Sequence, residues 1–213
     1  MSPPPFPLEI FDLIVDLLHD KRTLQECCVV SQSWVPRARR NLFSHILFSK
    51  YFPIELWMKA FPDPSSSPAH YARILCIDGP TVVAAAGTSA RAWVRAMRYI
   101  VELRISNGLA DGSPVSLFPL SGLFPVLKSL SIITLYIPPS ELLSHICSFP
   151  SLKDLELCLI HDQGTTATFE WSAPSTPPEL TGTLRLGGYI RSVVRRLLGL
   201  PYFFPLRRYC DGV

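Results

Sequence analysis

Residues Leu127–Ile132 read Leu-Lys-Ser-Leu-Ser-Ile, and the pattern of this hexapeptide organises most of the chain. Apolar residues occupy its first, fourth and sixth positions, and the alternation at its end predicts a short strand. The motif occurs five times, at Ala72–Ile77, Ile100–Ile105, Leu127–Ile132, Leu152–Leu157 and, more weakly, Thr181–Leu186. Its central leucines are Leu75, Leu103, Leu130, Leu155 and Leu184, which are 28, 27, 25 and 29 residues apart. The chain therefore contains an internal repeat.

The segments between these strands have helical patterns, at Ala90–Tyr99, Glu141–Cys147 and Tyr189–Leu198. A strand and a helix that recur about every 20–29 residues are typical of a leucine-rich-repeat solenoid with parallel strands. The Asn or Cys expected after each strand of that repeat is replaced by residues such as Gly108, Leu135 and Ile160. We therefore expect an α/β repeat fold, a short irregular solenoid in which parallel strands alternate with helices. A single irregular α/β domain is the alternative.

The N-terminal segment Pro5–Leu18 predicts a helix that is apolar around most of its circumference. It reads Pro-Phe-Pro-Leu-Glu-Ile-Phe-Asp-Leu-Ile-Val-Asp-Leu-Leu. At 100° per residue, its acidic side chains share one narrow stripe, and apolar side chains cover the remaining arc of roughly 220°. A helix that covers a single core needs an apolar arc of little more than about 100°. This helix should therefore either lie in the middle of its domain or pack on two separate surfaces.

Two further helices are predicted within a few residues. Thr23 suits the cap of a helix over Leu24–Ser31, because Glu26 follows it three residues later. Pro36 suits the first turn of a third helix that continues to Phe43. Three helices in about 40 residues are near the lower limit for independent stability. We expect this three-helix domain at residues 5–48, a linker at 49–69 and the repeat region at 70–213.

The N-terminal unit resembles the F-box. The family's motif has a Pro-Leu entry, then Glu-Ile and an apolar helix, a Val-Ser/Cys-x-x-Trp element and a basic third segment. Its pieces here are Pro7-Leu8-Glu9-Ile10, Ile14, Leu17-Leu18, Cys28-Val29-Val30-Ser31-Gln32-Ser33-Trp34 and Leu42-Phe43. The resemblance covers residues 5–48. With the degenerate repeats that follow, the chain is similar to the large F-box family of mushroom-forming fungi.

This resemblance implies a partner and a function. In the family, the first helix and its Pro-Leu entry dock on the adaptor subunit of an SCF-type cullin–RING ubiquitin ligase, and the rest recruits a protein target. The residues implied to face the adaptor are Pro7, Leu8, Ile10, Phe11, Ile14, Leu18, Val30 and Trp34. Trp34 has a second interpretation, because it could instead close the three-helix core. The alternative function is a non-catalytic scaffold whose helices pack on its own repeats.

Composition argues against several other classes. Hydrophobic residues make up 48% of the chain and charged residues 17%, so we expect a folded protein. No apolar run reaches the roughly 20 residues of a membrane span, and the acids at positions 9, 12 and 16 argue against a signal peptide. We therefore expect no membrane partner and an intracellular location, cytoplasmic or nuclear. A net charge of +3 is too small to indicate nucleic-acid binding. No polar capping repeat follows Leu206–Cys210. We therefore expect that the repeat region is truncated.

Catalytic and cofactor motifs are not found in the sequence. Gly187-Gly188 is a lone pair rather than a phosphate-binding loop, and neither a GxSxG nor an HExxH motif occurs. The cysteines, Cys27, Cys28, Cys76, Cys147, Cys158 and Cys210, form no CxxC pair, so we expect buried thiols rather than disulfides or zinc ligands. We expect no enzymatic activity, no cofactor and no metal.

Overall fold

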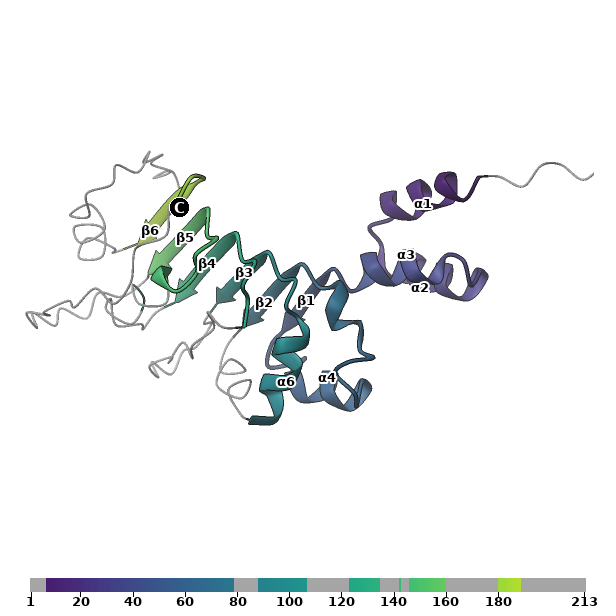
Figure 1. Ribbon diagram of the computed structural model, residues 1–213, viewed down its shortest axis with the longest axis horizontal. Helices are drawn as coiled ribbons and strands as arrows, with labels where there is room; N and C mark the ends of the chain where they lie inside the picture. The colour runs from purple at the N-terminus through teal and green to yellow at the C-terminus, as the bar shows by residue number, and fades with distance from the viewer. Residues whose placement is uncertain are drawn as a thin grey trace, which may run out of the picture.

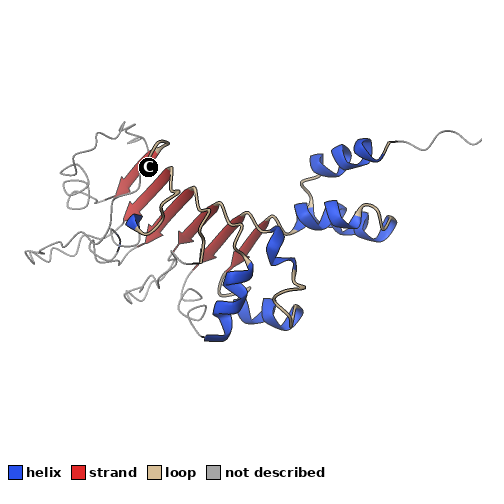
Figure 2. Ribbon diagram, viewed as in Figure 1, coloured by secondary structure: helices blue, strands red, loops and turns tan. Residues whose placement is uncertain are grey.

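The computed structural model describes residues 7–78, 88–106, 123–134, 142, 146–159 and 180–188 of the 213-residue chain. These residues form three N-terminal helices and a six-stranded parallel sheet with further helices, an α/β arrangement (Figure 1). The three N-terminal helices lie beyond the first strand of the sheet, and the other helices gather below the sheet near the same end (Figure 2).

The N-terminal helices are α1 (Leu8–Leu17), α2 (Lys21–Val30) and α3 (Val35–Leu42). Helix α2 begins at Lys21 rather than at the predicted Leu24, because Asp20 and not Thr23 caps it. The carboxylate of Asp20 accepts hydrogen bonds from the backbone N–H and from the hydroxyl of Thr23, both at 2.8 Å. A carboxylate at this position also carries the negative charge that a helix N-terminus favours. The prediction of Thr23 as the cap is therefore wrong.

The sheet contains one strand for each repeated motif and one strand before them. Its strands are β1 (His45–Phe48), β2 (Ile74–Asp78), β3 (Glu102–Ser106), β4 (Ser129–Thr134), β5 (Asp154–Leu159) and β6 (Leu184–Gly188). They pair in sequential order, and every pair is parallel. All five strands predicted from the repeat are present and parallel, which confirms this part of the predicted fold.

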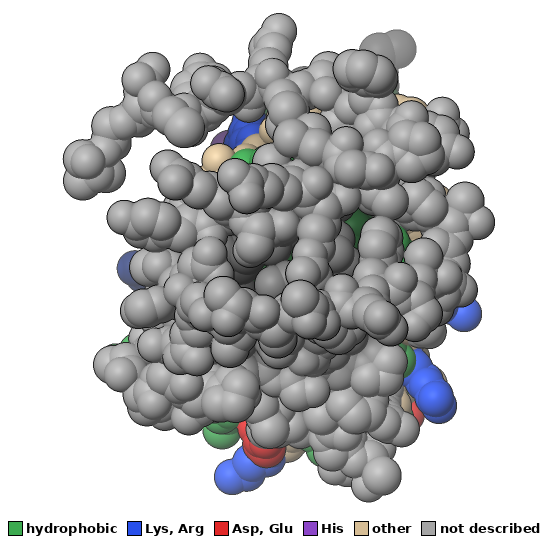
Figure 3. All heavy atoms as spheres, turned by 90° about the vertical axis from the view of Figure 1, so that its left-hand side faces the viewer, with side chains coloured by type: hydrophobic (Ala, Val, Ile, Leu, Met, Phe, Trp, Pro, Cys, Tyr) green, Lys and Arg blue, Asp and Glu red, His purple; other side chains and the backbone are tan. Residues whose placement is uncertain are grey.

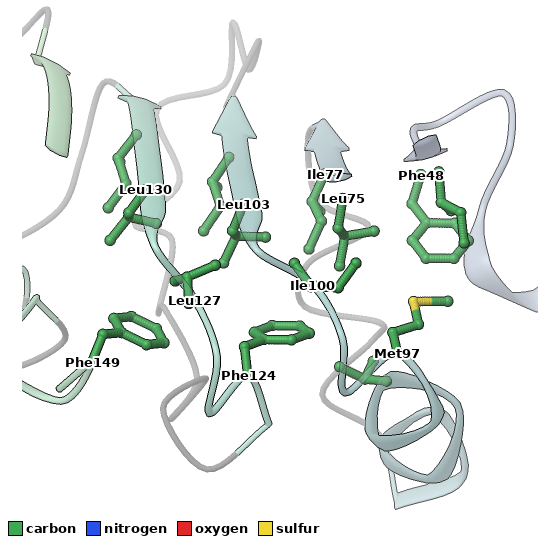
Figure 4. Packing of buried hydrophobic residues seen from close by; sticks show 14 of the residues in the cluster. Phe48, Leu75, Ile77, Met97, Ile100, Leu103, Phe124, Leu127, Leu130 and Phe149 are labelled. Atoms are coloured by element: carbon green, nitrogen blue, oxygen red, sulfur yellow. The ribbon is translucent and has the colours of Figure 1, made fainter. Parts of the chain in front are cut away.

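The repeat places equivalent residues opposite one another. The five central leucines, from Leu75 to Leu184, are register partners across successive strands, and Ile46 of β1 begins the same row. A second apolar row runs through Phe48, Ile77, Ile105, Ile132, Leu157 and Leu186. Successive side chains of a strand point to opposite faces, so both rows lie on one face of the sheet and form its core (Figure 4).

The backbone joins one repeat to the next in a recurring way. The carbonyl oxygen of Ser44 accepts hydrogen bonds from the N–H groups of Arg73 and Ile74, at 2.8 and 3.0 Å. Equivalent pairs of bonds run to the carbonyls of Arg73, Val101 and Lys128 from the following repeat. The entries of β2, β3, β4 and β5 are therefore each held by two hydrogen bonds to the preceding segment, and a one-residue slip would break both.

Residues 45–71 differ from the expected organisation. Strand β1 is the first strand of the sheet although it lies inside the range assigned to the helical unit. The range assigned to a linker contains α4 (Ile54–Ala60) and the 3-10 helix η1 (Pro68–Tyr71). Ile54 and Ala69 are fully buried in the core of the sheet. Burial of these apolar residues against the sheet outweighs the turn-forming prolines and serines between them.

Two separate cores hold the described residues together. The larger one fills the space between the sheet, α4, η1 and α6 (Thr88–Ala96), with Met97, Ile100, Phe124 and Phe149 beneath the strands (Figure 4). The smaller one consists of Val15, Leu24, Cys27 and Ala38 within the three-helix unit. The helical unit therefore has a core of its own, but a very small one.

The remaining sequence predictions fall partly outside the described residues. The helix predicted at Ala90–Tyr99 corresponds to α6, which begins two residues earlier. Of the helix predicted at Glu141–Cys147, positions 142, 146 and 147 are described, and they are helical. The helix predicted at Tyr189–Leu198 lies outside the described residues. Among the described helices, none is long and apolar enough to cross a membrane.

The row of leucines predicts that substitutions on the two faces of β4 lower the stability of the protein by different amounts. Leu130 is 1% exposed and Ile133 is 42% exposed. Leu130→Ala should lower the free energy of unfolding by about 2–5 kcal/mol, because it leaves a cavity in the core. The control Ile133→Ala should lower it by less than about 1 kcal/mol. Chemical denaturation followed by circular dichroism measures both, and equal losses would contradict the assignment of the two faces.

Candidate docking surface on the three-helix unit

Helix α1 has one buried face and one exposed face, and both are apolar. Val15 is 2% exposed and belongs to the small core. On the other side, Ile10, Leu13, Ile14 and Leu17 are 41%, 62%, 50% and 75% exposed. These four residues follow the i, i+3, i+4, i+7 spacing that brings side chains to one side of a helix. We call them the α1 stripe.

The buried face of α1 packs on the turn between α2 and α3. The rings of Phe11 and Trp34 lie 5.4 Å apart between centroids, and Leu18 and Trp34 are partly buried against the small core. Trp34 also begins α3, where its carbonyl accepts a hydrogen bond from the N–H of Ala38 at 2.9 Å. This face is therefore already occupied by the chain's own helices.

Polar contacts fix the rotation of α1 about its axis. The guanidinium of Arg37 on α3 donates to both carboxylate oxygens of Asp16, and the bond from its Nε to Oδ1 measures 2.6 Å. The side-chain amide of Asn41 donates to the carbonyl of Val15 at 3.0 Å and to Asp16 Oδ1 at 3.1 Å. Together these bonds hold Val15 toward the core, so the α1 stripe must point away from α3.

The end of α2 adds two exposed apolar residues. Val29 and Val30 are 88% and 70% exposed. They precede the turn at Ser31–Trp34, in which the N–H of Trp34 donates to the carbonyl of Ser31 at 3.1 Å. Because Phe11 of α1 contacts Trp34, the N-terminal half of α1 and the C-terminal end of α2 meet at this turn. The two exposed apolar groups therefore belong to the same end of the helical unit.

The structure places the predicted docking residues in two groups. Pro7, Ile10, Ile14 and Val30 are exposed, whereas Phe11, Leu18 and Trp34 are partly buried within the helical unit. The side chain of Leu8 lies outside the described part of the chain. Leu13, Leu17 and Val29 are exposed apolar residues that were not among the predicted docking residues. The helical spacing of Leu13 and Leu17 from Ile10 was the signal that could have found them.

The face of the sheet opposite the core is the second candidate surface, and it is polar. Arg104 Nε donates to Glu102 at 2.6 Å within β3. The hydroxyl of Ser131 on β4 donates to Glu156 on the adjacent strand β5 at 2.9 Å. The N–H of Thr183 donates to Asp154 at 2.7 Å. Lys and Arg side chains project at the margin of the molecule when it is viewed toward the β6 end (Figure 3). The charged strand residues on this face are Asp78, Glu102, Asp154 and Glu156, beside Arg104 and Arg185.

His45 and Cys76 form a cross-strand pair on that polar face, with 3.1 Å between Nε2 and Sγ. Burial raises the pKa of the Cys76 thiol above its ordinary value. Burial also lowers the pKa of His45, and the positive charges of Arg104 and Lys21 lower it further. Near neutral pH the pair is therefore a thiol and a neutral imidazole, whereas a nucleophilic cysteine needs a lowered pKa. Among the described residues, no group of three or more His, Cys, Asp or Glu is placed to hold a metal ion.

Comparisons with known proteins give no relative to which the chain can be assigned. No protein-family model matches it, and searches of curated proteins and of solved structures found no significant match.

The Asp16–Arg37 pair predicts an acid-dependent stability of the helical unit. The hydrogen bonds from Arg37 and Asn41 hold the pKa of Asp16 below its ordinary value of 3.8. Ionised Asp16 therefore stabilises the fold above that value, and the contribution is lost as the pH falls through the lower folded pKa. Asp16→Asn should flatten the fall in melting temperature between about pH 5 and pH 2.

Circular dichroism of the full chain at a series of pH values measures this effect. Arg37→Gln is the matched control, because it keeps the carboxylate but removes its main partner and should also weaken the pH dependence. An Asp16→Asn variant with the same pH profile as the parent protein would contradict the role of the pair.

Proposed function

We propose that the protein is a target-recruiting subunit of an SCF-type cullin–RING ubiquitin ligase. The three-helix unit docks on the ligase adaptor, and the sheet region holds a protein target. The observation that carries the proposal is the α1 stripe, an exposed apolar face on a helix whose opposite face is already packed. An amphipathic helix with exposed anchors at i, i+3, i+4 and i+7 is a common way for proteins to dock.

Energetics supports an external partner for this helix. Complete burial of a leucine or isoleucine contributes about 1.5–3 kcal/mol, so covering the half that is exposed contributes roughly 1 kcal/mol per residue. The small core holds four fully buried residues, and such a unit gains much of its stability from what it binds. The resemblance of residues 5–48 to the F-box gives the partner its identity in this proposal.

The scaffold alternative requires a different arrangement of α1. If the helical unit packed back on the chain's own repeats, Ile10 and Ile14 would be covered by the sheet region. Both are exposed, and the N-terminal helices lie beyond β1 rather than over the sheet (Figure 1). These observations favour docking on another protein over packing within the chain.

The register-matched leucine row supports the repeat assignment within this proposal. Equivalent leucines at intervals of 25 to 29 residues, on parallel strands in sequential order, are what a leucine-rich-repeat solenoid needs. In such a protein the polar face of the sheet would present the target. The mechanism is proximity, because holding a target beside a loaded ubiquitin carrier raises the effective concentration of its lysines.

The proposal is tested by co-purification with an SCF adaptor subunit. The double variant Ile10→Asp with Ile14→Asp should weaken binding at least about 100-fold, because it places two charges in an apolar interface. The control Ile133→Asp makes the same change on the exposed face of β4, and should leave adaptor binding unchanged. Melting curves of both variants check that the fold is retained. Unchanged binding by the double variant, or no binding by the parent protein, would rule out the proposal.

A further inference from the structure

A groove runs along the free edge of β1. Its volume is about 430 Å³, and all four residues of β1 line it. Ile46 and Phe48 point to the core face of the sheet, while His45 and Leu47 point to the opposite face. A hollow that reaches both sets of side chains must follow the strand's backbone edge rather than either face.

That edge is unpaired in the part of the chain that the structure describes. Strand β1 pairs with β2 on one side and is the last strand of the sheet on the other. The outer edge of such a strand carries N–H and C=O groups that can pair with an added strand. The far wall of the groove comes from Lys21 and Gln25 of α2, and its floor comes from α4. The groove is therefore a slot between a strand edge and two helices.

The walls of the slot are apolar and partly exposed. Leu47, Phe52 and Leu56 are 50%, 64% and 51% exposed, and all three line it. Below them, the ring of Trp57 makes edge contacts with Phe43 and Phe48. The indole N–H of Trp57 is buried and has no hydrogen-bond partner among the described residues.

The charge around the slot has one sign. The charged side chains are Lys21 in the slot and Arg39 in an adjoining hollow of about 400 Å³, while His45 in the slot is neutral near neutral pH. No Asp or Glu lines either hollow. Gln25, Leu42, Phe43 and Phe61 line both hollows, so Lys21 and Arg39 lie in neighbouring hollows.

We propose that this slot binds an extended peptide segment of a partner protein, which adds to β1 as an extra strand. Backbone hydrogen bonds to the free edge supply affinity, and the apolar walls receive alternate side chains. The basic rim selects acidic residues beside those apolar positions. Four residues of β1 span about 13 Å, so a core of about four peptide residues is bound. This site is separate from the α1 stripe and does not depend on the ligase proposal.

A library of random linear dodecapeptides displayed on phage, selected against the full chain, tests the binding site. The selected peptides should be enriched in Asp or Glu next to alternating apolar residues, and synthetic copies should bind in fluorescence anisotropy. Leu47→Ser with Phe52→Ser should weaken binding at least tenfold, and Lys21→Glu should weaken the acidic peptides selectively. The control Ile10→Asp with Ile14→Asp should leave peptide affinity unchanged, which separates this site from the adaptor surface.

Two further measurements test strand addition itself. Hydrogen exchange at residues 45–48 should slow when the peptide binds, and N-methylation of alternate peptide amides should abolish binding in one register only. The proposal is overturned if no peptide is selected, if the selected peptides are not acidic, or if the groove variants bind as well as the parent protein. It is also overturned if the chain dimerises in light scattering and Leu47→Ser makes it monomeric, because the slot would then hold a second copy.

Discussion

The alignment of one apolar row across six parallel strands is the constraint on which the structure depends. Leu75, Leu103, Leu130 and Leu155 are fully buried register partners. A shift of one residue in β2, β3, β4 or β5 would turn its leucine to the opposite face and break the paired bonds at the strand entry. The intervals between repeats vary by a few residues, so the connecting segments absorb the variation and the strands do not. The polar face and the edge of β1 owe their positions to this alignment.

A second constraint acts on the N-terminal helices. Their core is too small to use all the apolar surface of α1, and Asp16, Arg37 and Asn41 determine which face turns inward. The α1 stripe is what remains. An exposed apolar face of this kind often marks an interaction site. In the proposed function, the adaptor subunit of the ligase would cover it. The helical unit and the sheet thus present different surfaces, one apolar and one polar.

The sequence predicted the helices and strands that have a strong apolar periodicity. It did not predict those that form because of their packing against the rest of the chain. The five repeat strands followed from alternating apolar residues at a regular interval. Strand β1 did not, because His45–Phe48 is short and has an isoleucine where the other strands have leucine. The sequence predicted Thr23 rather than Asp20 as the cap of α2, because a capping box is a pattern of residue types. Only the hydrogen-bond geometry shows that Asp20 is the cap. Ile10 and Ile14 are exposed, and so are Leu13 and Leu17, which share their helical spacing but were not among the predicted docking residues.

In the proposed function, the α1 stripe is an interface for another protein. Methyl NMR of the chain with labelled Ile, Leu and Val side chains, in the presence of a soluble paramagnetic agent, measures the exposure of each residue directly. On addition of an SCF adaptor subunit, the methyl groups of Ile10, Leu13, Ile14 and Leu17 should lose their relaxation enhancement, while the buried Val15 should not change. Unchanged enhancement along the α1 stripe in the presence of saturating adaptor would contradict the account.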